Sequence, residues 1–170
     1  MVTIKTAQLS DAILIANMSR DTFVETFAEH NTKEDMDKFL STQFTIAQLT
    51  AEVGVESNQF FIAYYNNIPS GYLFLKTKTH PFLSHTGSAI EISRLYAYRS
   101  FIGKGIGKAL MHKAIDIAKT SAKQKIWLGV WEQNQRAIDF YTSFGFTKFS
   151  EHDFILGNDV QRDWLMERPL

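Results

Sequence analysis

The sequence predicts a mixed α/β (α+β) domain, in which a sheet of about seven strands carries helices on both of its faces. Short apolar runs with strand patterns recur along the chain. The elements follow the order strand, helices, meander, then strand, helix, strand, helix and a final hairpin, which is typical of a mixed sheet. With 170 residues, 45% of them hydrophobic, the chain is long enough for one core, so residues 1–170 are taken as a single domain.

The first third of the chain is predicted to be helical after one short strand. Val2 to Thr6 alternates as a strand, and Ser10-Asp11 is placed to cap a helix whose apolar face runs from Leu14 to Phe27. Thr32 to Asp35 and Thr45 to Gln48 each fit a capping box or a close variant of one. Two further short helices should therefore follow.

The rest of the chain alternates strands with helices. Gln59 to Tyr65 and Gly71 to Thr77 have strand patterns and should pair as a hairpin through residues 66–71, and His80 to Ser88 is expected to be a loop. The later elements are a strand over Ile90 to Tyr96, a helix over Ile106 to Ala118, a strand over Lys125 to Trp131, a helix from Asn134, and a hairpin of Phe146 to Leu156 with Val160 to Arg168.

Three glycines stand between the Ile90 strand and the Ile106 helix. Gly103, Gly105 and Gly107 occupy alternate positions, where a backbone without Cβ atoms lets a ligand approach the main-chain N–H groups. The helix that follows adds unpaired N–H donors and a partial positive charge at its first turn. A phosphate or pyrophosphate is the ligand that this arrangement favours.

Two common phosphate-binding motifs do not fit the glycine loop. A Walker A loop would need glycine at Ile102 and a hydroxyl at Ala109, and a dinucleotide fingerprint that starts at Gly103 would need glycine at Lys108. The loop instead resembles motif A of the GNAT superfamily of N-acetyltransferases, Gln/Arg-x-x-Gly-x-Gly/Ala, with Gly105 and Gly107 as the glycine pair.

In the GNAT family, the amides of this loop hold the pyrophosphate of acetyl-coenzyme A (acetyl-CoA). Ile102 stands where the family has Gln or Arg, so one side-chain contact is missing and weaker binding is expected. The alternative is a glycine-rich connection between strand and helix that binds no ligand.

A second segment carries the same resemblance. Asn134 to Phe146 is similar to GNAT motif B, Asn-x-x-Ala-x-x-Phe-Tyr-x-x-x-Gly-Phe, at each specified position. Asn134 is a candidate N-cap, and it shares about one side of the helix with Ala137 and Tyr141. The resemblance implies that Asn134 contacts the cofactor and that Tyr141 protonates the departing thiolate. The alternative for Tyr141 is a packed ring with its hydroxyl in water.

The resemblance covers most of the chain and implies a GNAT-like, twisted, mostly antiparallel sheet. Two cations, Lys104 and Lys108, belong to a basic stretch and are expected near the phosphates of acetyl-CoA. The residues expected to bind the cofactor are Leu95, Tyr96, Ala97, Ile102, Gly103, Lys104, Gly105, Ile106, Gly107, Lys108, Asn134, Ala137 and Tyr141.

The chemistry also needs a base and a polarised thioester carbonyl. An amine attacks only as the free base, and Glu91 is the candidate that removes its proton. Motif A strands in this family carry a bulge that changes which face a residue uses. The alternative for Glu91 is an edge carboxylate or a salt bridge to Arg94. A main-chain N–H within Leu95 to Ala97 is expected to stabilise the oxyanion.

An acidic stretch bears on the acceptor. Asp21, Glu25 and Glu29 lie at i, i+4 and i+8 of the first helix, where a nearby cation would relieve their repulsion. With Phe23 and Phe27 they are similar to the N-terminus of bacterial spermidine/spermine N-acetyltransferases. Phe23, Glu25 and Phe27 are therefore the expected acceptor-binding residues. The alternative is a solvated helix face above a phenylalanine core.

Composition excludes several other classes. The formal net charge is zero, so nothing global favours nucleic acid, and the absence of cysteine excludes disulfides and thiolate chemistry. The five histidines lack metal-ligand spacing, so no metal site is expected. The chain has no long apolar run or signal pattern, so no membrane association is expected. A cytoplasmic location is expected instead. By analogy, a homodimer would form through the strand Val160 to Arg168.

The sequence thus predicts an enzyme that transfers an acetyl group from acetyl-CoA to a primary amine of a small molecule, with polyamines first among the acceptors. One alternative is a peptide or protein N-terminal acetyltransferase. Another is a catalytically weak acyl-CoA-binding sensor. Ile102 is the feature that favours this alternative, and the presence of both Asn134 and Tyr141 argues against it.

Overall fold

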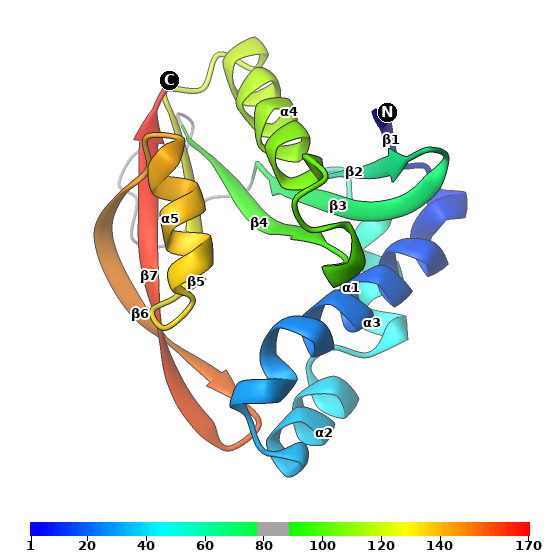
Figure 1. Ribbon diagram of the computed structural model, residues 1–170, viewed down its shortest axis with the longest axis vertical. Coiled ribbons are helices and arrows are strands. Elements are labelled where there is room, and N and C mark those ends of the chain that lie inside the picture. The colour runs from blue at the N-terminus through cyan, green and yellow to red at the C-terminus, as the bar shows by residue number, and fades with distance from the viewer. Residues whose placement is uncertain (78–88) are drawn as a thin grey trace.

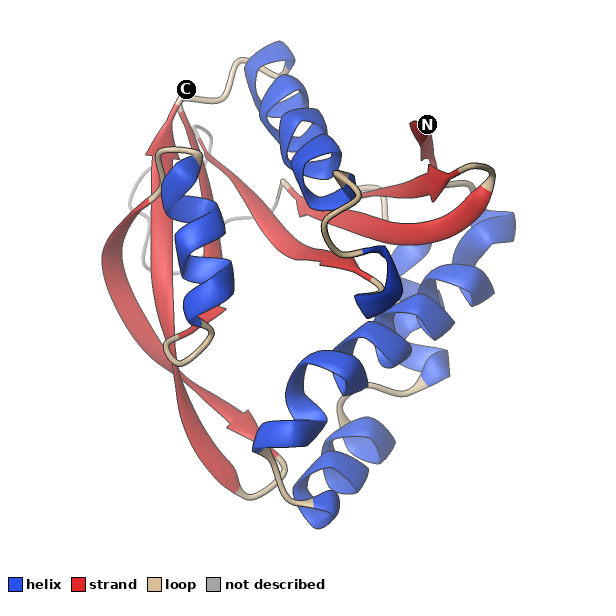
Figure 2. Ribbon diagram, in the orientation of Figure 1, coloured by secondary structure: helices blue, strands red, loops and turns tan. Residues whose placement is uncertain are grey.

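The computed structural model describes residues 1–77 and 89–170 and shows a seven-stranded sheet with helices on both faces (Figures 1 and 2). The strands are β1 (Val2–Thr6), β2 (Asn58–Tyr65), β3 (Ile68–Lys76), β4 (Ala89–Ala97), β5 (Lys125–Trp131), β6 (Thr147–Leu156) and β7 (Asp159–Pro169). The helices are α1 (Ala12–Phe27), α2 (Lys33–Thr42), α3 (Ile46–Val53), α4 (Ile106–Thr120) and α5 (Gln135–Ser143). The predicted fold class is confirmed.

The strands lie in the order β1-β2-β3-β4-β5-β7-β6, and only β4 and β5 run parallel to each other. A parallel pair needs a crossover, and α4 supplies it. Helices α4 and α5 cover one face, whereas α1 and α3 pack on the other face and α2 lies against the far end of β6. Figure 1 shows β4 turning away from β5, so that the sheet opens into two arms.

The middle residues of the neighbouring strands β2 and β3 are buried on both faces of the sheet, which explains their unbroken apolar runs. Phe61 and Leu73 belong to the core beneath α4, and their neighbours Phe60 and Tyr72 belong to the core beneath α1. Helix α4 buries the six residues with the helical spacing seen in the sequence: Ile106, Leu110, Met111, Ala114, Ile115 and Ala118. Local periodicity therefore fixes which side of each element faces the sheet.

Caps and turns agree with the predictions in part. Thr32 and Thr45 cap α2 and α3, as predicted. Asp11 is the N-cap of α1, as predicted, but its carboxylate makes no capping hydrogen bond to α1 and instead accepts from the N–H of Gln8 across the 3-10 turn of residues 9–11. The β2–β3 turn is tighter than predicted. Asn66 and Asn67 both have positive φ, which suits a two-residue hairpin turn, so the strand resumes at residue 68. The expected loop at residues 80–88 lies outside the described residues.

The last strand, through which a homodimer was expected by analogy, is not an edge of the sheet. β7 is an inner strand, because residues 163–169 pair with β5 and residues 159–167 pair with β6. Both sets of main-chain groups are used over most of its length, so a partner strand has no free edge there. β6 and β1 are the edge strands of the sheet.

Candidate functional site

A wedge between β4 and β5 creates the site. The two strands pair only from Ala89 to Ile92 on β4, and beyond that point they separate. Ser93 is an extra residue on β4, since Phe74 of β3 pairs with Arg94 and its neighbour Leu75 pairs with Ile92. This is the bulge predicted for the strand. It bends β4 away from β5 and leaves the edge of β4 that faces β5 unpaired beyond Ile92.

A cleft of about 880 Å³ fills this wedge. Its walls come from the glycine loop and the start of α4, from α5, from β4, β5 and β7, and from the C-terminal half of α1. Most of the predicted cofactor residues line it together: Leu95, Tyr96, Ala97, Ile102, Gly103, Gly105, Ile106, Gly107, Lys108, Asn134, Ala137 and Tyr141. The structure thus gathers residues from two separate sequence motifs into one space.

The glycine loop forms a cradle at one end of the cleft. Gly103 and Gly105 both have φ of 82°, and a Cβ built on either one would meet no other atom within 4 Å. Gly105 is the N-cap of α4, and its carbonyl oxygen accepts from the N–H of Ala109 at 3.0 Å. The N–H groups of residues 106–108 therefore remain available at the positive end of the helix dipole. A phosphate group fits this arrangement.

Gly107 has a different role from the other two glycines. It lies inside the first turn of α4, where a Cβ would come 3.5 Å from the ring of Phe140 on α5. It therefore faces the packing contact between α4 and α5, where a Cβ would make an ordinary van der Waals contact. The sequence did not separate this packing role from the anion-binding role.

Helix α5 forms the opposite wall. Asn134 caps it, with Oδ1 accepting from the N–H of Ala137 at 3.2 Å. Tyr141 lies two turns further on, is 9% exposed, and makes no hydrogen bond through its hydroxyl within the described residues. Burial raises the pKa of Tyr141 to about 12. The hydroxyl therefore keeps its proton at neutral pH, as a proton donor must.

The centre of the cleft is the open edge of β4. Leu95 and Ala97 pack toward the α4 core, and Tyr96 points to the other face, where it joins the aromatic clusters. Burial raises the pKa of Tyr96, and the neighbouring hydroxyls of Tyr72 and Tyr141 raise it further. Because β4 and β5 no longer pair beyond Ile92, the main-chain groups of residues 95–97 that face the wedge have no strand partner. They are free to donate to a carbonyl oxygen.

Aromatic side chains enclose the end of the cleft that lies beyond Tyr96. Phe23 packs against Phe27 and Phe39 with ring centroids 4.5 and 4.6 Å apart, and Phe27 reaches Trp131 at 5.9 Å. Both predicted phenylalanines, Phe23 and Phe27, therefore line the cleft and also belong to the core. Their place in the core agrees with the second interpretation that the sequence offered, and their role in binding the acceptor stays a prediction.

The acidic residues of α1 find partners within the chain. Glu25 lines the cleft, but its carboxylate accepts the N–H of Arg99, and the Arg99 guanidinium lies 3.7 Å from Glu29. Asp21 accepts from the hydroxyl of Tyr98 at 3.2 Å. The cation that the sequence led us to expect near these acids is thus, at least in part, the protein's own Arg99.

Two predicted site residues lie outside the cleft lining. Lys104 places its Nζ over the rings of Tyr65 and Phe101, at 5.2 and 4.7 Å from the centroids. Glu91 lies just before the first lining residue of β4, next to Lys76 and Trp127 in register. Burial raises its pKa, and nearby Lys76, Arg94 and His152 lower it.

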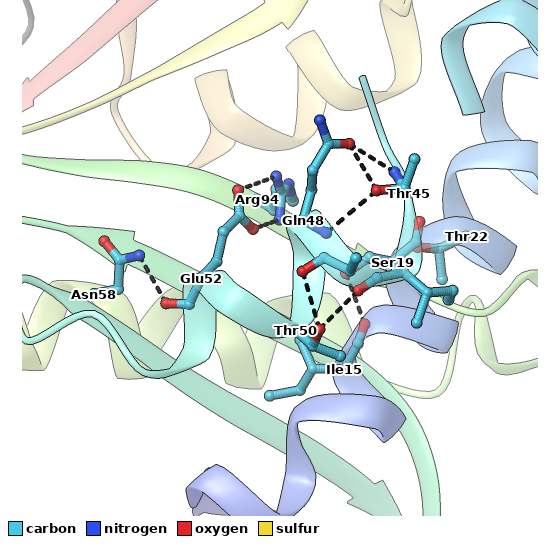
Figure 3. Close-up of polar contacts among 11 residues, drawn as sticks. Ile15, Ser19, Thr22, Thr45, Gln48, Thr50, Glu52, Asn58 and Arg94 are labelled. Carbon is cyan, nitrogen blue, oxygen red and sulfur yellow. Dashed lines mark hydrogen bonds and ion pairs between the residues drawn. The ribbon is translucent and has the colours of Figure 1, made fainter. Parts of the chain in front are cut away.

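Arg94 is held by α3 and not by Glu91. Its guanidinium makes two hydrogen bonds to the Glu52 carboxylate, at 2.6 and 3.0 Å, and lies over the rings of Phe44 and Phe74. Figure 3 shows this pair, with the main-chain oxygen of Glu52 accepting from Asn58 at 2.9 Å. The contact fastens α3 to β4 directly after the bulge, so it stabilises the shape of the wedge.

Sequence reasoning missed several lining residues. Arg136 on α5 adds a cation, and Gly129, Gln161 and Asp163 form a polar patch on β5 and β7. The alternation of Gln161 and Asp163 in the predicted final strand was a signal, because residues two apart share one face. Which strands would flank that face was not readable from the sequence.

Metal and membrane features are absent from residues 1–77 and 89–170. No group of three or more metal-ligating side chains is placed to hold an ion there. None of the helices in those residues is both long and apolar enough to cross a membrane. Two of the five histidines, His80 and His85, lie outside the described residues.

Known proteins resemble the chain at two levels. The family model for the acetyltransferase (GNAT) family matches residues 16–146. An uncharacterized N-acetyltransferase of Lactobacillus delbrueckii subsp. lactis is 36% identical over 172 residues, which cover 100% of this chain and 99% of that protein.

Solved structures agree in fold. The N-acetyltransferase PaiA of Thermoplasma acidophilum, in complex with coenzyme A, has a TM-score of 0.77 at 21% identity and covers 100% of this chain and 99% of its own. The structure of yncA from Salmonella typhimurium, with its cofactor acetyl-CoA, has a TM-score of 0.72 at 20% identity and covers 100% and 94%. At these identities the likeness shows the fold alone. The family match and the full-length relative carry the assignment: this chain belongs to the GNAT family of acetyltransferases.

Proposed function

We propose that the protein transfers the acetyl group of acetyl-CoA to a primary amine of a small molecule that carries an apolar or aromatic body. Acetyl-CoA-dependent N-acetyl transfer follows from the family, and the nature of the amine is our proposal. The observation that carries it is the single cleft, which joins the glycine cradle, the open edge of β4 and the Tyr141 hydroxyl to an aromatic end.

The cofactor suits the residues that are present. The cradle of Gly103 and Gly105 leaves open the space that a Cβ would enter, which gives room for a pyrophosphate, and Lys108 and Arg136 bring positive charge to the cleft lining. When bound, acetyl-CoA supplies an acetyl thioester. In our proposal, a main-chain N–H of residues 95–97 polarises its carbonyl group and Tyr141 gives its proton to the leaving sulfur.

The apolar character of the acceptor rests on the composition of the cleft. Four basic residues line it (Arg94, Arg99, Lys108 and Arg136), against three acidic ones (Glu25, Glu29 and Asp163). A polyamine carries several positive charges and would need unpaired carboxylates along its length. Because Glu25 and Glu29 already contact Arg99, the cleft offers less to a polycation than to an amine with one charge and an apolar body.

An amine panel tests the proposal. Purified protein with acetyl-CoA would be assayed for thiol release with 2-phenylethylamine, spermidine and an unblocked tetrapeptide, alone and in competition. We expect 2-phenylethylamine to be acetylated with the highest kcat/KM. A preference for spermidine would restore the polyamine acceptor, and a preference for the tetrapeptide would indicate a peptide N-terminal acetyltransferase.

Calorimetry with acetyl-CoA separates a catalytic failure from a binding failure. Binding that is weakened by a substitution at Gly105 supports the cradle as the cofactor site. Binding without thiol release for any of these amines would favour the acyl-CoA-binding sensor. A cytoplasmic location and a homodimer stay predictions, and strand addition in such a dimer would have to use β6 or β1.

A further inference from the structure

The wall of the cleft formed by β7 carries an acidic side chain that the family motifs do not include. Asp163 lines the cleft and pairs across the sheet with Trp131 of β5 on one side and with His152 of β6 on the other. Strand alternation places Gln161 on the same face, two residues away. This face is the one that meets the aromatic end of the cleft, opposite the face covered by α5.

The Asp163 and His152 side chains lie close to Gly129 of β5. A Cβ on Gly129 would lie 3.7 Å from Oδ2 of Asp163 and 3.9 Å from Nε2 of His152. Any longer side chain on this residue of β5 would fill the space between the cleft and these two groups.

The same wall presents an unused hydrogen-bond acceptor. Gln161 is 8% exposed, and its Nε2 donates to Asn31 at 2.6 Å and to Asp159 at 3.0 Å. Since the Asp159 carboxylate can only accept, this orientation of the amide is fixed. Its Oε1 is buried and has no partner in the described part of the chain. A buried acceptor without a partner costs free energy, and an N–H donor of a bound molecule would remove this cost by donating to Oε1.

Asp163 on the wall of the cleft and His152 of β6 are neighbours. Oδ2 of Asp163 lies 3.7 Å from Nε2 of His152, and the side chains are 18% and 33% exposed. The more exposed group is the imidazole, so the exposed fraction increases from the cleft to solvent. Glu91 also lies close enough to His152 to interact with it electrostatically.

The surroundings of Asp163 strengthen it as a base. Burial raises its pKa, the neighbouring His152 lowers it, and Glu132 at the end of β5 raises it. Asp163 and Tyr141 both raise the pKa of Tyr96 on β4, so both lie close enough to its phenol to interact with it electrostatically. A carboxylate whose pKa is raised toward neutrality accepts protons more readily than one in water.

We propose that Asp163 binds the ammonium group of the acceptor and removes its proton, and that His152 is the positioning residue that carries this proton to solvent. The inference rests on the proposed function and names the base of that reaction. It moves this role from Glu91, which lies outside the cleft lining, to a carboxylate on the cleft wall.

The protons balance as follows. The ammonium nitrogen gives its first proton to the Asp163 carboxylate, which passes it through His152 to water. The free amine then forms the C–N bond as the C–S bond breaks, and the nitrogen loses a second proton. Tyr141 gives its hydroxyl proton to the leaving sulfur. The second proton from nitrogen then returns to the Tyr141 oxygen through solvent. One proton is released in each turnover.

The test compares Asp163→Asn with Asp153→Asn, an exposed carboxylate of β6 that pairs with Arg162 and does not line the cleft. Each variant would be assayed with 2-phenylethylamine, or with the amine of the panel that the wild type acetylates best, and acetyl-CoA binding would be measured by calorimetry. We expect Asp163→Asn to lower kcat/KM at pH 7 by about 10²-fold, as loss of a general base does, with unchanged acetyl-CoA binding.

The pH profile distinguishes a base from a structural residue. In Asp163→Asn, kcat/KM should rise about tenfold per pH unit toward the pKa of the amine, about 10, because only amine already neutral in solution can react. His152→Gln should move the acid limb of the profile to higher pH, since it removes the neighbouring imidazole that lowers the Asp163 pKa. Glu91→Gln should lose less activity than Asp163→Asn.

Two results would overturn the inference without touching the proposed function. One is an active wild type whose Asp163→Asn variant matches Asp153→Asn. The other is a variant whose deficit stays constant from pH 7 to 10. If the wild type acetylates none of the amines, the proposed function itself has failed. Binding of 2-phenylethylamine to the coenzyme A complex provides a readout independent of turnover, and Asp163→Asn should weaken it at least fivefold.

Discussion

Arg99 and Glu25 join the glycine loop to helix α1. The main-chain N–H of Arg99 donates to Oε2 of Glu25 at 2.8 Å, and the Arg99 guanidinium donates to the carbonyl oxygen of Glu25 at 2.6 Å. Arg99 opens the 3-10 turn that leads from β4 to Gly103. The position of the cradle relative to the acceptor end of the cleft therefore depends on a carboxylate of α1.

Glu25→Ala should weaken acetyl-CoA binding more than it raises the KM of the amine. It removes the partner of the Arg99 N–H, and a loss of about 1 kcal/mol in the positioning of the loop corresponds to roughly a fivefold higher Kd. Glu25→Gln keeps an acceptor oxygen and should change Kd less than twofold. Calorimetry with acetyl-CoA measures both. If both variants raise only the KM of the amine, and equally, the carboxylate belongs to the acceptor.

Gly105→Ala should impair the cradle in two ways. A φ of 82° costs an alanine about 1–2 kcal/mol, and its Cβ would project into the space that a pyrophosphate needs. We expect at least a tenfold loss of acetyl-CoA affinity, with a decrease in Tm of about 2–8 °C. The matched variant Gly107→Ala, whose φ is not positive, should lose less affinity. Equal losses would argue against a ligand above Gly105.

Local signals account for what the sequence predicted well. The helical spacing of Ile106 to Ala118, the capping residues Thr32 and Thr45 and the motif B helix depend on neighbours in the sequence, and the structure has all of them. The gathering of the two motifs into one cleft was likewise expected from the family resemblance.

Long-range contacts account for what the sequence did not predict. Insertion of β7 between β5 and β6 decides that Asp163 faces the cleft, and this depends on pairing between segments far apart in the chain. The hydrogen bond from the Arg99 N–H to the Glu25 carboxylate joins residues 74 positions apart in the sequence. Burial, which raises the pKa of Tyr141, also has no local signal.

Tyr141→Phe should lower kcat by about 10²-fold and leave acetyl-CoA affinity unchanged, because it removes one proton donor and retains the ring. Burial disfavours the phenolate and raises the pKa to about 12, so the wild-type hydroxyl stays protonated through pH 10. The wild-type rate should therefore not fall between pH 8 and 10 through ionisation of Tyr141. A fall that is caused by this ionisation would be absent from Tyr141→Phe. Such a decrease, with a midpoint near 10, would mean that the phenol titrates as if it were in water.

Tyr72 is a test of the core behind the cleft. Its hydroxyl is fully buried beneath α1 and meets the geometric criteria for a hydrogen bond with none of the described residues, although the hydroxyls of Ser19 and Thr22, which donate to the carbonyls of Ile15 and Met18, lie close enough to influence it. An unpaired buried hydroxyl costs about 1–3 kcal/mol. Tyr72→Phe should therefore leave the free energy of unfolding unchanged or raise it by about 1 kcal/mol, as measured in urea.

The matched control for Tyr72→Phe is Tyr98→Phe, because the Tyr98 hydroxyl does have a partner. It donates to Asp21 at 3.2 Å near the surface, so its removal should lower the free energy of unfolding by about 0.5–1 kcal/mol. The two substitutions delete the same atom and should differ in sign. If Tyr72→Phe instead destabilises the protein by more than 1 kcal/mol, the Tyr72 hydroxyl donates to the Ser19 or Thr22 oxygen in solution, and the core beneath α1 contains a hydrogen-bond network.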